Sequence, residues 1–98
     1  GSAGTHIGVA RVALRVEDAA AVRPGEVLVC PVTAPAWNLA MARAGAVVCD
    51  TGGQLSHAAI TARELSVPAV VGCRDATATL RTGERVLVDG AAGTVRRL

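Results

Sequence analysis

The stretch that most constrains the fold is a buried strand that leads through a glycine pair into a helix. The apolar run Ala46-Val47-Val48-Cys49 predicts the strand, and Gly52 and Gly53 follow shortly after it. Glycine permits backbone angles and close approaches that other residues resist. Ser56 is a good N-cap, because its hydroxyl can accept a hydrogen bond from an unpaired amide of the first turn. The pattern therefore predicts a helix that starts at Ser56 and places His57 at its first position.

The position of His57 suggests a chemical role. A histidine in the first turn of a helix lies among free N–H groups and at the positive end of the helix dipole. The charged ring is disfavoured there, so we expect the imidazole of His57 to stay neutral and nucleophilic. The same amides would favour an anionic group bonded to the ring. These are the properties of a phosphoryl-accepting histidine, although a histidine without this context more often caps a helix or fills a core.

The composition indicates one small domain with a core of small aliphatic side chains. The chain has 98 residues, no Phe or Tyr, and one tryptophan, Trp37. We expect Trp37 to anchor the core, because large aromatic side chains dominate burial; an exposed docking residue is the alternative. Ten arginines, without any lysine, are scattered among eight acidic residues, which gives a net charge of +2. Nucleic-acid binders carry a clustered basic footprint, so we expect no nucleic acid as a partner.

The cysteines and the chain ends point to a cytoplasmic protein without a metal. Cys30, Cys49 and Cys73 each adjoin an apolar run and form no C-x-x-C spacing. We therefore expect buried, reduced thiols and no zinc site. We expect neither a signal peptide nor a membrane span. Gly1-Ser2 resembles the remnant of an expression tag, and residues 1–6, including His6, are expected to be loose, which leaves a domain of residues 7–98.

Short strands and short helices alternate along the chain. Strands are predicted over residues 7–16, 27–30, 46–49, 69–72, 85–89 and 94–98. Helices or helical turns are predicted over residues 17–22, 36–44, 56–65 and 75–80. Strands alternate with helices in the middle, while hairpin-like strands lie at both ends. The fold class is therefore predicted to be α/β: a compact β/β/α domain with a mixed sheet and short helices.

At this point the motifs carry a family resemblance. The run TGGQLSHAAITAREL, followed by VPAVVG, resembles the signature of the phosphohistidine, or swivelling, domain of PEP-utilising enzymes. That family includes PEP synthase, pyruvate phosphate dikinase, enzyme I of the sugar phosphotransferase system and rifampicin phosphotransferase. Thr33-x-Pro35, Gly45-x-Val47-Val48 and Val88-Asp89-Gly90-x-x-Gly93-Thr94-Val95 are similar to the same domain. The resemblance covers about residues 7–97.

The resemblance implies a mobile phosphocarrier in which His57 is transiently phosphorylated. The domain would swing between an ATP-binding, ATP-grasp-like domain and a site where the phosphoryl group passes to or from pyruvate/PEP or another acceptor. Mg-ATP and PEP or pyruvate would bind to those partner domains and no cofactor to this one, because the chain lacks lysine and a P-loop pattern. The chain would be one domain of a phosphotransferase and would not complete the reaction alone. The alternative is a non-catalytic module of the same fold that docks on a partner or binds a small anion.

The resemblance also assigns supporting residues around the histidine. Gly52 and Gly53 match the family's loop glycines and, with Thr51, would form a phosphate-binding loop. Ser56 is either an N-cap or a direct phosphate contact. Arg63 matches an arginine further along the helix. It lies six residues after the histidine and does not share its helix face, which favours a structural contact over a phosphate contact.

Three positions depart from the family pattern, and one of them is Ala34, which replaces the polar residue often found between Thr33 and Pro35. Leu55 stands where many dikinases carry a threonine, whose hydroxyl could bond the imidazole or the phosphate. Asp50, Thr51 or a backbone carbonyl is left as the group that orients the ring, and Asp50 fits simple loop capping equally well. Ser66 stands where glycine is usual, which predicts some strain at the C-terminus of the helix.

Overall fold

The computed structural model describes residues 3–53 and 55–98, so Gln54 and the expected tag remnant Gly1-Ser2 lie outside the described residues. The strands are β1 (Thr5–Val12), β2 (Val27–Cys30), β3 (Ala46–Cys49), β4 (Ala69–Val70), β5 (Arg85–Asp89) and β6 (Thr94–Arg97). The helices are α1 (Asn38–Arg43), α2 (His57–Glu64) and α3 (Ala76–Thr79), with two 3-10 helices, η1 (Asp18–Ala21) and η2 (Pro35–Trp37). No described helix is both long and apolar enough to cross a membrane.

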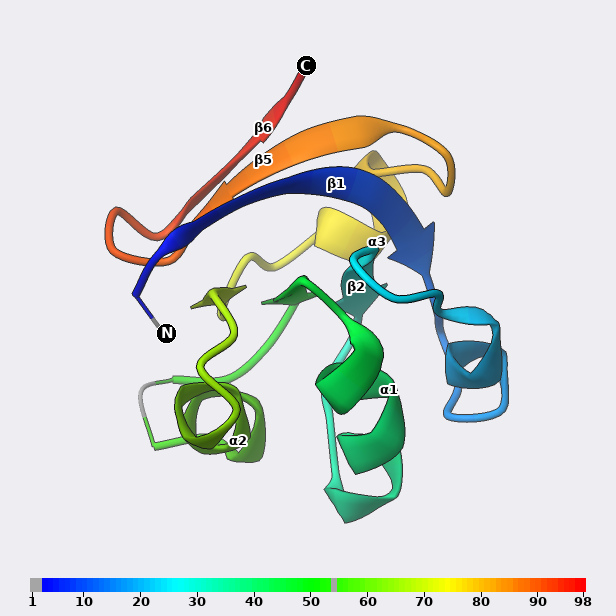
Figure 1. Cartoon of the computed structure of the whole chain (residues 1–98), viewed down its shortest axis with the longest axis vertical. Coiled ribbons are helices and arrows are strands. Elements are labelled where there is room, and N and C mark those ends of the chain that lie inside the picture. Colours follow the sequence, from blue (N-terminus) through cyan, green and yellow to red (C-terminus); the bar gives the residue numbers. More distant parts are fainter. Residues whose placement is uncertain (1–2, 54) are drawn as a thin grey trace.

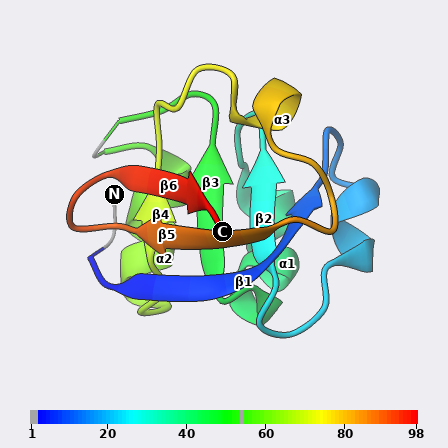
Figure 2. The same ribbon diagram turned by 90° about the horizontal axis from the view of Figure 1, so that it is seen from above.

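The strands form one mixed sheet in the order β4-β3-β2-β1-β5-β6. The pairs from β4 to β1 are parallel, whereas β5 pairs antiparallel with both β1 and β6. β1, β5 and β6 curl over one side of the molecule, and α1 and α2 lie on the other side (Figure 1). The view from above shows β5 and β6 crossing over β2 and β3 (Figure 2). The predicted α/β domain with a mixed sheet is therefore confirmed.

The central strands are buried on both faces, which explains their uninterrupted apolar sequences. Along β2, Leu28 and Cys30 join the core beneath the helices, while Val27 and Val29 join the core beneath the curled strands. Trp37 is 7% exposed and belongs to the helix-side core, so its predicted role as a core anchor is confirmed. The two layers position the ends of β2 and β3 side by side, in register from Val27↔Ala46 to Cys30↔Cys49.

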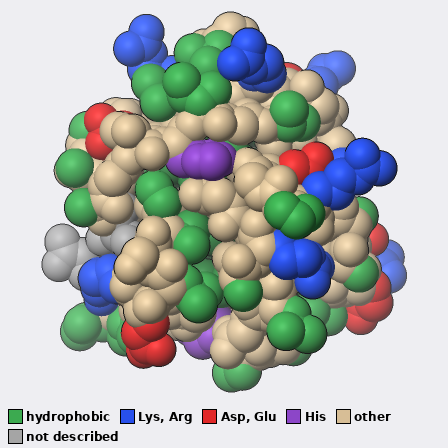
Figure 3. Space-filling model, viewed as in Figure 1, with side chains coloured by type: hydrophobic (Ala, Val, Ile, Leu, Met, Phe, Trp, Pro, Cys, Tyr) green, Lys and Arg blue, Asp and Glu red, His purple; other side chains and the backbone are tan. Residues whose placement is uncertain are grey.

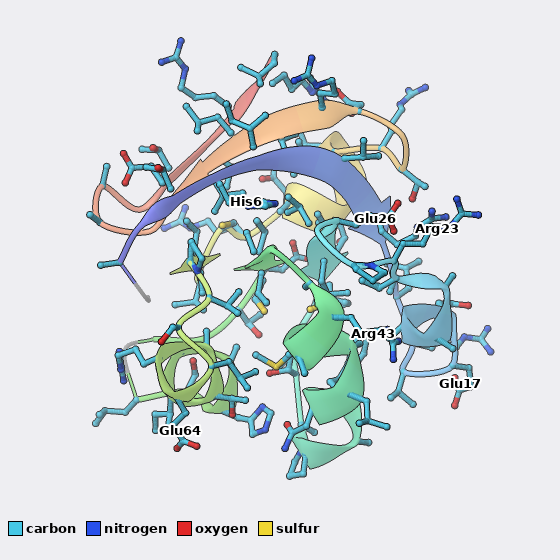
Figure 4. The ribbon with its side chains drawn as sticks, viewed as in Figure 1. His6, Glu17, Arg23, Glu26, Arg43 and Glu64 are labelled. Carbon is cyan, nitrogen blue, oxygen red and sulfur yellow. The ribbon has the colours of Figure 1, made fainter. Side chains whose placement is uncertain are left out.

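β1 differs from its predicted bounds at both ends. It already includes Thr5 and His6, which the sequence had suggested were loose. The Nε2 atom of His6 lies 2.7 Å from the carbonyl oxygen of Gly25, and Figure 4 shows this side chain beneath the sheet. The strand ends at Val12, whose N–H donates to the hydroxyl of Thr82 instead of to a neighbouring strand. One more bond to β2 follows, from the N–H of Ala13 to the carbonyl of Val29 at 2.8 Å, and residues 14–17 then form bends and turns although the apolar alternation continues.

Helix α1 is tied to η1 by the side chain of Arg43. Its Nε donates to the carbonyl of Val22 at 3.0 Å and its Nη2 to the carbonyl of Ala19 at 3.2 Å. Arg43 points from α1 toward η1 in Figure 4. The carbonyl of Ala19 also accepts the N–H of Val22 at 3.1 Å, so Arg43 adds a second bond to that carbonyl and binds the carbonyl of Val22 just after η1. The contact holds the segment after β1 against the helix layer.

Candidate functional site

The site is built at the start of α2. Ser56 has an extended backbone, and its Oγ accepts a hydrogen bond from the Ala59 N–H at 3.3 Å. The same hydroxyl donates to the carbonyl of Gly53 at 2.7 Å. The predicted N-cap is thus confirmed, and His57 is the first residue of the helix. Because the single hydroxyl hydrogen of Ser56 is already donated within the loop, this side chain acts as a structural cap.

The two loop glycines serve different purposes. Gly52 has φ +115°, a region that L side chains rarely adopt, and a Cβ there would lie 3.0 Å from the Oγ of Ser56. Gly53 has no atom within 4 Å of the place where its Cβ would be. The backbone conformation therefore requires glycine at position 52. At position 53 the absence of a side chain leaves open space beside the start of the helix.

The side chain that orients His57 is Thr33. Its Oγ1 lies 2.7 Å from the Nδ1 of His57. Thr33 is 6% exposed and is the one polar residue that is buried in the described part of the chain. Sequence reasoning missed this role and considered Asp50, Thr51 or a backbone carbonyl instead. The available signal was that Thr33 follows β2 and the histidine loop follows β3, because the carboxyl ends of neighbouring parallel strands meet at one edge of the sheet.

Asp50 and Thr51 hold the loop in place through hydrogen bonds to other segments, whereas Thr33 is the residue that contacts the imidazole. The carboxylate of Asp50 accepts hydrogen bonds from the N–H and the hydroxyl of Thr77, at 2.9 and 2.5 Å. Thr51 donates to the carbonyl of Pro31 through both its N–H, at 3.0 Å, and its Oγ1, at 3.1 Å. Asp50 therefore fastens the loop to α3, while Thr51 fastens it to the segment that carries Thr33. Among the described residues, the hydrogen bonds of the Asp50 carboxylate are with Thr77, and none is with the ring of His57.

The remaining predicted residue, Arg63, lies in the last turn of α2 with an exposed side chain. It is thus at the opposite end of the helix from His57. In Figure 3 the arginines (blue) are dispersed over the face in view, without a continuous basic surface. Within residues 3–53 and 55–98, no group of three His, Cys, Asp or Glu is arranged to hold a metal ion.

The three cysteines are free thiols: Cys30 and Cys49 are the last residues of β2 and β3, and Cys73 lies three residues after β4. The Sγ atoms of Cys30 and Cys49 lie 3.5 Å apart in the core. The contact with Cys49 and the burial both raise the pKa of the Cys30 thiol. Burial is also the main reason why the pKa of the half-buried Cys73 rises to about 11. The thiols of Cys30 and Cys73 therefore stay protonated at neutral pH, which makes them poor nucleophiles and metal ligands.

The arrangement suits a nucleophile that gains a negative group. Thr33 holds one nitrogen of a half-buried imidazole, and the other nitrogen, Nε2, has no hydrogen-bond partner among the described residues. Likewise, the backbone N–H groups of His57 and Ala58 find no acceptor within the described part of the chain. Amides at the N-terminus of a helix bind anions such as phosphate. The site therefore combines a positioned ring nitrogen with anion-binding amides.

Comparison with known proteins agrees with this arrangement. Residues 22–93 match the family described as PEP-utilising enzyme, mobile domain. Phosphoenolpyruvate synthase of Aeropyrum pernix is 50% identical over 95 residues, which cover 96% of this chain and 12% of that protein. The uncharacterized phosphotransferase YvkC of Bacillus subtilis is 44% identical over 94 residues, covering 96% of this chain and 11% of that protein. The solved structure of Enzyme I matches with a TM-score of 0.69 and 31% identity, covering 81% of this chain and 33% of that one.

Fold and site together define an α/β swivelling domain with a histidine at the start of a helix. The chain belongs to the mobile-domain family of PEP-utilising enzymes. It spans only about a tenth of the length of the curated relatives described above, 12% and 11%. Membership of this family implies that other domains accompany it in the same protein.

Proposed function

We propose that the chain is the phosphocarrier domain of a larger phosphotransferase, and that His57 carries the phosphoryl group on Nε2. The observation behind this proposal is the 2.7 Å contact between the Oγ1 of Thr33 and the Nδ1 of His57. It occupies one ring nitrogen and leaves the other accessible. A side chain that is held in one orientation beside open space is what an in-line attack on phosphorus requires.

The hydroxyl of Thr33 can accept a hydrogen bond from Nδ1–H, and this tautomer leaves a lone pair on Nε2. Attack by that lone pair forms the N–P bond, while the bond between phosphorus and the leaving oxygen breaks and its electron pair leaves with the oxygen. The proton stays on Nδ1 throughout. The positive charge that develops in the ring is stabilised by the oxygen of Thr33, which faces the retained N–H.

The phosphoryl group brings negative charge to the start of α2. The amides of His57 and Ala58, which find no acceptor among residues 3–53 and 55–98, and the positive end of the helix dipole stabilise that charge. The open space at Gly53 gives the group room beside the loop. In this scheme Gly52 and Ser56 shape the loop, Asp50 and Thr51 brace it, and none of the three side chains of Ser56, Asp50 and Thr51 has to contact phosphate.

We further propose that the donor and acceptor sites lie on other domains. The chain has no lysine and no P-loop pattern with which to hold a nucleotide. An ATP-binding domain would charge His57 from Mg-ATP, and a second domain would pass the group to pyruvate, PEP or another acceptor. The name of the Aeropyrum pernix relative, phosphoenolpyruvate synthase, supports this class of acceptor. Arg63 is assigned a structural role, because it lies at the far end of α2 from the reacting ring.

The test is to incubate the full-length protein with ATP or PEP and to look by mass spectrometry for an acid-labile phosphate on this domain. His57→Ala should abolish the adduct, whereas His6→Gln, which changes the chain's other histidine, should retain it. Nitrogen-15 NMR of the labelled ring should place the phosphorus on Nε2. The absence of an adduct from either donor would favour the non-catalytic module, and phosphorylation on Nδ1 would contradict the role given to Thr33.

A further inference from the structure

Two large apolar side chains flank the pair formed by His57 and Thr33, and both face solvent. Leu55 precedes His57 by two residues and is 87% exposed, and Val32 directly precedes Thr33 and is 56% exposed. The bond between Thr33 and His57 brings the two segments together. Single exposed hydrophobic residues are ordinary on protein surfaces. Two of them beside a reactive nitrogen indicate a surface that becomes covered when the site is in use.

The surroundings of this pair offer a partner little net charge. Three charged side chains lie on the segments that follow β3 and β4 at this edge of the sheet: Asp50, Arg74 and Asp75. The carboxylate of Asp50 is already held by Thr77. Arg74, whose N–H donates to the carbonyl of Asp50, and Asp75 carry opposite charges next to each other. A partner that approaches His57 before it is phosphorylated therefore meets mainly apolar side chains.

We propose that Val32 and Leu55 form a contact surface, here called the apolar collar. Through this surface the unphosphorylated carrier docks on an apolar patch of the phosphoryl-donor domain. This inference rests on the carrier function proposed above. Before transfer no phosphoryl group is present to attract the donor domain electrostatically, so apolar contact supplies the docking energy. After transfer the phosphoryl group itself can be recognised electrostatically by the acceptor domain. The collar should therefore matter most in the charging step.

The collar also affects the chemistry. When its two side chains are covered, water is excluded from the space around Nε2, and the phosphoryl group passes to the ring instead of to water. A contact centred on two side chains is small. This suits a carrier that must dissociate from each domain on which it docks. Linkage within one polypeptide compensates for weak docking, because it raises the effective concentration of the carrier near the donor domain.

The test compares two phosphoryl donors on the same variants of the full-length protein. ATP charges His57 through the donor domain, whereas potassium phosphoramidate, a small chemical donor, needs no docking. Leu55→Ser and Val32→Ser should each lower the rate of ATP-dependent charging by about tenfold, the usual effect of truncating an interface anchor. Their rates with phosphoramidate should equal that of the wild type. Leu55→Met should restore charging by ATP, and Ile7→Ser, at a 52% exposed position on β1, is the matched control.

The outcomes separate the collar from the carrier function. If neither donor labels His57 in the wild type, the carrier function itself is wrong. If the wild type is labelled and the serine variants are charged by ATP at the wild-type rate, the collar is refuted and the carrier function stands. Slower labelling by phosphoramidate would assign the two residues to the folding or chemistry of the site. A defect confined to transfer from His57 to the acceptor would place the contact on the other domain and overturn the assignment.

Discussion

Replacing Thr33 with valine tests the centre of the proposed site. Valine keeps the shape of the side chain but removes the hydroxyl that lies 2.7 Å from the Nδ1 of His57. Thr33 is 6% exposed, so water cannot take the place of the hydroxyl without a local opening. A hydrogen bond of this kind contributes about 1 kcal/mol net. Its loss from the orientation of the ring should slow phosphorylation about fivefold, since about 1.4 kcal/mol corresponds to tenfold in rate.

The assay is the rate at which phosphoramidate labels His57, followed by mass spectrometry, because this donor reports on the ring without any docking step. Nitrogen-15 NMR of the ring should show Nδ1 protonated in the wild type and a mixture of tautomers in Thr33→Val. Thr33→Ser retains the hydroxyl and should label nearly as fast as the wild type. Thermal unfolding checks that all three proteins fold. An unchanged rate in Thr33→Val, with an unchanged tautomer, would refute the orienting role of this residue.

Three further predictions concern stability. Gly52→Ala should lower the free energy of unfolding by about 1–3 kcal/mol because Gly52 has a positive φ. Gly53→Ala should change it by less than about 0.5 kcal/mol. Equal losses for the two variants in urea unfolding would contradict this. Ser66→Gly should stabilise the domain by about 0.5–1 kcal/mol, measured in the same way, because Ser66 has φ +57° just after α2. The Arg11 side chain donates twice to the Glu26 carboxylate and lowers the pKa of Glu26. The wild type should therefore be more stable than Glu26→Gln, and this difference should be complete above the unfolded-state pKa of Glu26, about 4.3. The difference should vanish as the pH falls through the lower folded-state pKa of Glu26. A difference in the free energy of unfolding that persists at pH 2 would contradict this.

The elements that the sequence predicted well depend on neighbours along the chain. β2, β3 and β5 have their predicted bounds, because each is a short apolar or alternating run that turn residues delimit. The cap at Ser56 bonds residues only three positions away, Gly53 and Ala59, so its geometry follows from the local sequence. The strain expected at Ser66 is likewise local, and its positive φ bears it out. β1 (Thr5–Val12) and β4 (Ala69–Val70) differ from their predicted ranges of residues 7–16 and 69–72, since their bounds depend on partners that are distant in sequence.

The functional residues also divide into those that the local sequence identified and those that depend on partners distant in the sequence. Sequence patterns alone led to His57, the glycine loop and the helix start, because all of these lie within one short stretch. They did not lead to Thr33, which is 24 positions from His57, or to the binding of Asp50 by Thr77, 27 positions away. The first contact exists because β2 and β3 are parallel neighbours in register, which brings the loops after them to the same edge of the sheet. The second exists because β4, which precedes α3, is the parallel neighbour of β3 on its other side. Strand order and register arise from the packing of the whole chain, so the partner of the imidazole became visible only in the folded domain.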